Sequence, residues 1–200
     1  MQLESRLSKI IYVSCLTIFL TGLGSWAVLA HQQNSAASQN QGADGDAHFA
    51  RAAASGNLAE IQLGKLAADH ASSDVVKAFA SRMVVQHTTA ADQLKAAAQK
   101  DSISLPGNLS SHDQQIYDRL VKLHGSAFDR EYAKRMVDDH QKDLADFQNE
   151  AGSGQSNDMK AFAANSISMI QEHLNQAREM LASVSQQSTN PRQRSNASGR

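Results

Sequence analysis

The sequence predicts an all-α protein, a four-helix bundle with one long crossover, and three observations lead to this class. Only 5% of the 200 residues are aromatic and only two are proline, a composition that favours helices over a sheet. Apolar side chains recur at helical spacing over four long segments. The intervals between these segments are short, long and short, which predicts how the helices connect.

Each helix has its own start signal or stripe of apolar residues. Asp46 is a suitable N-cap for the first helix, and Ser72-Ser73-Asp74 breaks the pattern before the second. Pro106-Gly107 indicates a loop after the second helix, and Ser156 or Asn157 can cap the last one. The helices are therefore expected at residues 46–70, 74–100, 112–123, 126–150 and 157–184.

Loop lengths predict the topology. The first two helices, and likewise the last two, are joined by few residues, so each pair should form an antiparallel hairpin. Residues 101–125, which include the short helix, are enough to run back along the bundle. This is the ferritin-like connection. Both tight turns are expected at the same end of the bundle.

A nine-residue phrase occurs twice, as FASRMVVQH at 79–87 and as YAKRMVDDH at 132–140. An aromatic residue leads both copies, and Ala, Arg, Met, Val and His are identical. The aromatic, Met and His residues fall at i, i+4 and i+8, so in a helix they share one stripe. Each copy therefore places a histidine, His87 or His140, on a buried apolar face.

The outer helices repeat this arrangement with a different spacing. Phe49 lies eleven residues before Glu60, and Phe162 lies eleven residues before His173. Eleven residues are about three helical turns, so the aromatic and the ionisable side chain again point the same way. Each of the four long helices is thus expected to turn one ionisable group inward.

The four inward groups are Glu60, His87, His140 and His173. With both turns at one end, their Cα atoms should lie about 15 to 24 Å below it, and the tilt of each Cβ toward its helix N-terminus narrows that spread. Imidazole nitrogens with one carboxylate are a usual ligand set for Zn, Fe or Mn, so one transition-metal ion is predicted here. The alternative is a metal-free structural or interaction module, in which these groups form a buried polar layer.

Other features limit the possible functions. The formal net charge is −1 and there is no basic run, so no nucleic-acid partner is expected. No nucleophile–base pair, phosphate-binding loop or carboxylate dyad is visible, so the sequence does not indicate an enzyme. Asp129 is expected to cap the helix at 126–150 or pair with an arginine, and Arg82 and Arg135 are expected to form salt bridges beside the stripe.

The N-terminus has the pattern of an export signal. Arg6 and Lys9 precede an apolar run that ends with Val28-Leu29-Ala30, which suits cleavage by a signal peptidase after residue 30. An uncleaved membrane anchor is the alternative, since about 20 apolar residues can span a bilayer. The expected location is the periplasm or cell envelope, with a flexible linker at 31–45 and a disordered tail at 185–200.

Four segments resemble the domain-of-unknown-function 4142 family of exported bacterial proteins. They are EIQLGKLA from Glu60, residues 79–87, FDREY from Phe128, and QEHL around His173. The resemblance covers about residues 46–182 and implies a ferritin-like fold, an envelope location and no settled activity. The chain differs from di-iron ferritins, which carry Glu-x-x-His on two helices; here the residues three before the histidines are Val84, Val137 and Ile170. A single metal ion therefore suits the predicted ligands better than a di-iron centre.

Overall fold

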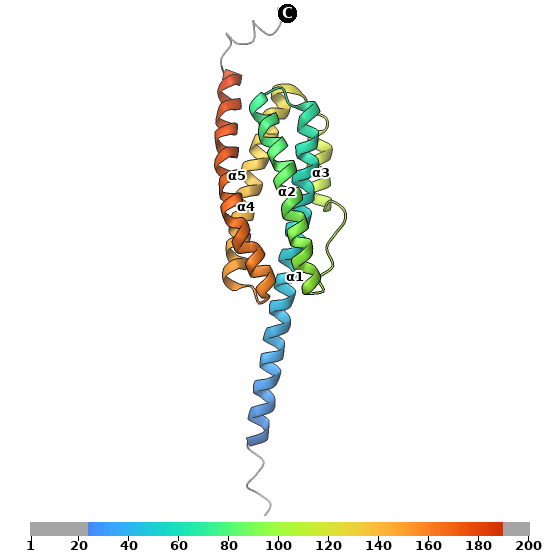
Figure 1. Cartoon of the computed structure of the whole chain (residues 1–200), viewed down its shortest axis with the longest axis vertical. Coiled ribbons are helices and arrows are strands. Elements are labelled where there is room, and N and C mark those ends of the chain that lie inside the picture. Colours follow the sequence, from blue (N-terminus) through green and yellow to red (C-terminus); the bar gives the residue numbers. More distant parts are fainter. Residues whose placement is uncertain (1–23, 190–200) are drawn as a thin grey trace, which may run out of the picture. The chain divides into compact units, whose positions relative to one another are not determined.

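The structure, a computed structural model, describes the backbone of residues 24–189 and the side chains of residues 44–187 (Figure 1). The chain divides into two units, residues 1–41 and 42–200, and the bundle belongs to the second. All regular secondary structure in the described part is helical, as predicted. The helices are α1 (Gly24–His70), α2 (Asp74–Lys100), α3 (Ser111–Leu120), α4 (Gly125–Ser153) and α5 (Asn157–Thr189).

The predicted bounds agree closely in the middle of the chain and less well at its ends. The predicted bounds of α2 are confirmed at both ends, and Ser156 caps α5, its Oγ accepting from the backbone N–H of Met159 at 3.1 Å. The predicted linker at 31–45 is helical in the structure, as part of α1. This stretch has no proline and contains several Ala and Gln residues, which are good helix formers.

The remaining terminal predictions lie largely outside the described residues. These are the greater part of the signal or anchor segment, 1–23, and the end of the tail, 190–200. The first five residues of the predicted tail, 185–189, continue α5. Among the helices of the described residues, none contains a stretch long and apolar enough to cross a bilayer.

The two tight turns lie at opposite ends of the bundle, so the prediction of a shared end was wrong. Asp129, near the start of α4, accepts a 2.5 Å hydrogen bond from the hydroxyl of Ser72 in the α1–α2 turn. Asp46, in α1, accepts a 2.6 Å hydrogen bond from the backbone N–H of Ser156 in the α4–α5 turn. The crossover returns the chain along the bundle, so α2 and α4 run in the same direction (Figure 1).

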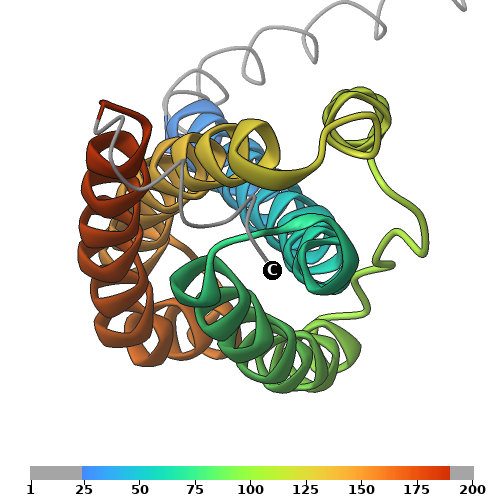
Figure 2. The ribbon, with the colours of Figure 1, turned by 90° about the horizontal axis from the view of Figure 1, so that it is seen from above.

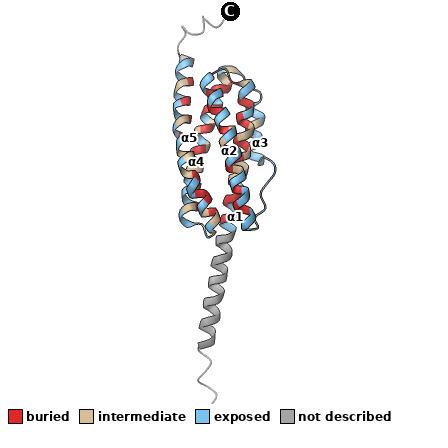
Figure 3. Ribbon diagram, viewed as in Figure 1, coloured by how far each residue is buried: buried red, intermediate tan, exposed pale blue. Residues whose placement is uncertain are grey.

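The long helices pack side by side, and α3 lies outside them (Figure 2). Their buried faces point inward (Figure 3), as their apolar periodicity predicts. The core has two apolar parts. One contains Met83 and Met136 from the repeated phrase, and the other is built on Phe49, which meets Phe147 edge to face at 4.9 Å between ring centroids. Between these two parts lie the buried residues His87, His140, His173 and Asn57.

Gly64 allows α1 and α2 to approach closely. A Cβ built on Gly64 would lie 2.7 Å from a Val84 methyl group and 2.9 Å from the backbone oxygen of Ala80. Because the backbone cannot swing aside as a side chain can, we expect Gly64→Ala to lower the free energy of unfolding by about 1–3 kcal/mol. Urea denaturation measures this change.

Gly56→Ala is the matched control in the same helix. A Cβ on Gly56 has only an Asp143 carboxylate oxygen nearby, at 4.0 Å. Alanine should therefore stabilise α1 at this position by up to about 1 kcal/mol, through its better helix propensity. Equal stabilisation by both substitutions would show that the contact at Gly64 does not limit the packing.

Candidate metal centre

Three of the four predicted residues meet inside the bundle. His87 comes from α2, His140 from α4 and His173 from α5, and each ring is almost completely buried. One ring nitrogen of each histidine lies within 4.8 Å of one ring nitrogen of each of the others. The ring centroids are 5.1 to 5.6 Å apart. The periodicity of the helices thus predicted the common face, and the fold places the three rings at a common height.

Each ring uses one nitrogen to bind its surroundings. Nδ1 of His140 donates to the carbonyl of Met136, one turn back in α4, at 2.8 Å. Nδ1 of His87 donates to Oδ1 of Asn57 in α1 at 2.9 Å. Nε2 of His173 donates to Oε1 of Gln86 in α2 at 2.7 Å. These three oxygens orient the rings, and they also determine which nitrogen of each ring carries the proton.

The second nitrogen of each ring has no partner among the described residues. Nε2 of His87, Nε2 of His140 and Nδ1 of His173 are all buried without a hydrogen bond. In a neutral imidazole whose other nitrogen donates, this nitrogen is a lone-pair acceptor. Three such acceptors cannot satisfy one another, and each unpaired one costs about 1–3 kcal/mol. Together they can bind one electrophile.

Burial keeps the three rings neutral. It lowers the pKa of His140 to about 4, although the hydrogen bond to the Met136 carbonyl opposes this shift. Burial also lowers the pKa of His173 to about 3, with further contributions from His140 and from the Arg82 guanidinium. The pKa of His87 is well below its ordinary value, first through burial and then through the neighbouring histidines. At neutral pH the unpartnered nitrogens therefore keep the lone pairs that a metal ion requires.

Glu60 is buried but does not join the three-histidine cluster. The opposite placement of the tight turns explains this. At about 1.5 Å per residue, Glu60 lies about 15 Å from the end where α1 finishes, whereas His87 and His140 lie about 20 and 22 Å from it. Its Cα atom is thus about one turn nearer that end than the Cα atoms of His87 and His140.

The surroundings of Glu60 are acidic as well as apolar. Burial raises its pKa well above the ordinary value, and Asp139 and Asp143 raise it further, while Arg135 acts in the opposite direction. One carboxyl oxygen, Oε2, is buried without a hydrogen bond, as is the hydroxyl of Tyr132. The charge of Glu60 also raises the pKa of that tyrosine, after burial, which is the larger cause.

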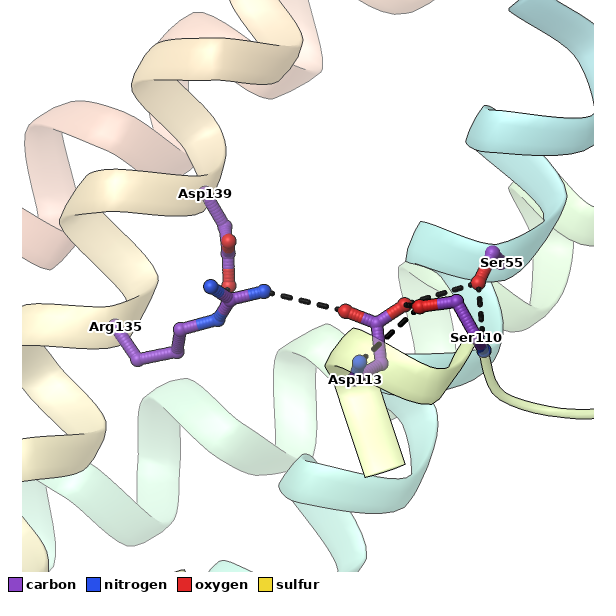
Figure 4. Close-up of polar contacts among 5 residues, drawn as sticks. All are labelled: Ser55, Ser110, Asp113, Arg135 and Asp139. Carbon is purple, nitrogen blue, oxygen red and sulfur yellow. Dashed lines mark hydrogen bonds and ion pairs between the residues drawn. The ribbon is translucent and has the colours of Figure 1, made fainter. Parts of the chain in front are cut away.

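Arg135 connects this acidic region to α3, which confirms the predicted salt bridges of this residue. Its guanidinium pairs with Asp139 on the next turn of α4 and with Asp113 in α3, the latter at 3.3 Å (Figure 4). Asp113 also accepts from the hydroxyls of Ser110, at 2.6 Å, and Ser55, at 2.9 Å. The network therefore ties α1, α3 and α4 together beside Glu60.

The residues that orient the rings were not predicted from the sequence. Asn57 lies one turn before Glu60 on the same face of α1, a spacing that could have identified it. Gln86 precedes His87 directly but serves the ring of His173, a contact between helices that no spacing within α2 reveals. Asp129 was expected to cap its own helix or pair with an arginine, but its carboxylate instead binds the α1–α2 turn.

Comparison with known proteins gives one match. A family model described as a domain of unknown function, DUF4142, matches residues 31–180, which include all three histidines and Glu60. No functionally curated protein and no solved structure matches the chain.

Proposed function

Since the chain belongs to the DUF4142 family, whose description specifies no activity, we propose a function from the site itself: His87, His140 and His173 bind one transition-metal ion in the core of the bundle. The observation that carries this proposal is the cluster of three buried histidines, each of which offers a ring nitrogen within 4.8 Å of the others and keeps one ring nitrogen without a hydrogen bond. A metal ion satisfies all three lone pairs at once, which no side chain of the cluster does.

The distances suit an ion after a small adjustment. Tetrahedral zinc with Zn–N bonds of about 2.0–2.1 Å holds its ligand nitrogens about 3.3 Å apart. The three nitrogens, now within 4.8 Å of one another, would therefore move together by up to about 1.5 Å. Rotation of the imidazole rings supplies such a movement, and the hydrogen bonds that the rings donate to Asn57, Gln86 and the Met136 carbonyl keep them in position.

The ligand chemistry favours zinc or iron, with manganese as a further candidate. Imidazole suits borderline divalent ions such as Zn²⁺ and Fe²⁺, whereas Mn²⁺ prefers sites that also provide carboxylates. Glu60 is a buried carboxyl group with an unpartnered oxygen outside the cluster, so it would complete a site for manganese only by moving toward the histidines. The absence of Glu-x-x-His spacing in the sequence argues against a di-iron centre.

The cellular part of the proposal rests on the sequence and the topology. We infer a ferritin-like bundle, supported by the parallel direction of α2 and α4 and by the long crossover between them. The charged and apolar N-terminal pattern supports export to the periplasm or cell envelope. A single-ion site in such a protein fits a role in metal handling or in protection against metal-dependent oxidative stress.

Zinc titration of chelator-stripped protein tests the function. We expect one Zn²⁺ per chain and a rise in melting temperature, because an ion at 100 times its Kd stabilises the folded state by about 2.7 kcal/mol. Isothermal calorimetry gives the stoichiometry and differential scanning fluorimetry gives the shift. No binding of Zn²⁺, Fe²⁺ or Mn²⁺ and no thermal shift would reject the proposal, and the histidines would then be a metal-free polar layer.

A further inference from the structure

A small cavity lies beside the histidine layer. Its volume is about 10 Å³, enough for one water molecule. All four long helices line it, and His87 forms part of its wall. Asp143 lies three residues after His140, and Ile170 lies three residues before His173. The cavity is therefore one turn from the cluster, on the side away from Glu60.

The protein supplies three ligands and leaves a fourth position open. Within the described residues, no fourth histidine, cysteine or carboxylate side chain belongs to the cluster. Zinc sites that serve only structure use four protein ligands, whereas sites with three keep the fourth position for water or a substrate. The three-histidine arrangement is thus of the second kind.

Charge determines which ligand this position prefers. The three rings are neutral donors, so a divalent ion bound by them retains its full charge in a buried site, which is unfavourable without an anion. The cavity wall can assist an anion. The amide Nδ2 of Asn57 is a buried donor without a partner. Asp143 also lines the cavity, and although burial raises its pKa to about 6, its carboxylate is still mostly ionised at neutral pH, so the charge of the divalent ion has to outweigh it.

We propose that the ion held by His87, His140 and His173 keeps an exchangeable fourth ligand, water at rest, that a monoanion of two or three heavy atoms displaces from the side of the cavity. This inference rests on the proposed metal site and specifies what it binds. The small volume excludes larger ligands, so the site selects by size as well as by charge. Asn57 both orients His87 and provides the donor that faces the incoming anion.

Cobalt and azide provide the test. The stripped full chain is loaded with one equivalent of Co²⁺, whose visible absorption bands report coordination number and ligand type, and is then titrated with sodium azide. We expect bands typical of a four-coordinate Co²⁺ site that shift saturably as one azide binds. The variant Glu60→Gln should give the same bands and the same azide response, because Glu60 is not a ligand.

A cavity-filling variant tests the direction of entry. Ala90 lines the cavity and is buried, so Ala90→Val should leave the cobalt bands unchanged and weaken azide binding by about tenfold or more, because the added methyl groups take up the space that the azide needs. Ala96→Val, on the exposed face of α2, is the matched control and should bind azide like the wild type. If Ala90→Val does not fold, Ala53→Val fills the cavity from α1.

The outcomes separate the two proposals. Absence of cobalt bands would reject the metal site itself. Cobalt bands that do not respond to azide in the wild type would overturn the open position while the metal site stands. In that case, an azide response gained in Glu60→Gln would identify Glu60 as the fourth ligand. Equal azide affinity in the wild type and the cavity-filled variant would overturn the assignment of the cavity as the binding side.

Discussion

Replacing His140 with alanine is expected to lower the affinity for Zn²⁺ by at least about a hundredfold, since loss of a mere supporting partner costs 10–100-fold and this change removes a ligand. His140 is the most buried of the three rings, with no exposed surface, and its tautomer is fixed by a backbone carbonyl rather than by a side chain that can rotate. The two remaining nitrogens cannot hold the ion in a buried site. Competition with a chromophoric chelator measures the affinity.

The control for this prediction is His112→Ala. His112 is exposed at the start of α3 and is not part of the cluster, so its removal should leave zinc affinity unchanged. A fold check by circular dichroism on the metal-free variants separates loss of the ligand from loss of structure. Wild-type affinity in a folded His140→Ala protein would show that zinc binds elsewhere.

Replacing Asp129 with alanine is expected to lower the free energy of unfolding by about 3 kcal/mol or more, because hydrogen bonds to a charged group contribute about 1.5–3 kcal/mol each and are not additive. The buried carboxylate accepts from the backbone N–H and hydroxyl of Ser72 and from the backbone N–H of Ser73. Ser73 is the N-cap residue of α2, but its side chain makes no capping bond. Asp129, which belongs to α4, therefore accepts the hydrogen bonds of the backbone N–H groups just before α2.

Urea denaturation of the metal-free protein measures this loss, with Asp138→Ala as the control. Asp138 lies on the exposed face of the same helix and should change the stability by no more than about 0.5 kcal/mol. Zinc stoichiometry should remain one per chain in a folded Asp129→Ala protein, because Asp129 lies eleven residues, about three helical turns, before His140. A decrease as small as that of the control would show that the α1–α2 turn does not depend on this carboxylate.

The sequence determined the helices and the inward faces because both depend on local periodicity. The repeated phrase at 79–87 and 132–140 identified two of the clustered histidines, and the spacing from Phe162 identified the third. The family resemblance is confirmed by the match over residues 31–180. These features need no knowledge of how the helices are arranged in space.

The main wrong prediction was that both tight turns lie at one end of the bundle. This error is the reason why Glu60 was expected to join the histidines. A long crossover that returns along the bundle makes α2 and α4 parallel, so the two tight turns fall at opposite ends. That arrangement levels His87 with His140 and moves Glu60 toward the α1–α2 end, into the acidic surroundings of Asp139. The position of a residue along the bundle depends on the direction of each helix, and the apolar periodicity of the sequence does not reveal that direction.

Contacts between segments far apart in the chain could also not be predicted from the sequence. Asp46 was predicted to cap α1, but it lies within that helix and its carboxylate binds the α4–α5 turn. Asp129 binds the turn at the other end in the same way. Both aspartates carry out a capping function for a partner segment far away in the chain, and only the assembled fold identifies that partner.

X-ray absorption spectroscopy of the protein loaded with one equivalent of Zn²⁺ tests the three-nitrogen site most directly. A three-histidine site should give a first shell of low-Z donors at about 2.0–2.1 Å, with outer-shell scattering that fits three imidazole rings and falls to two in His173→Ala. A first shell without imidazole scattering, or a spectrum identical in the wild type and His173→Ala, would contradict it.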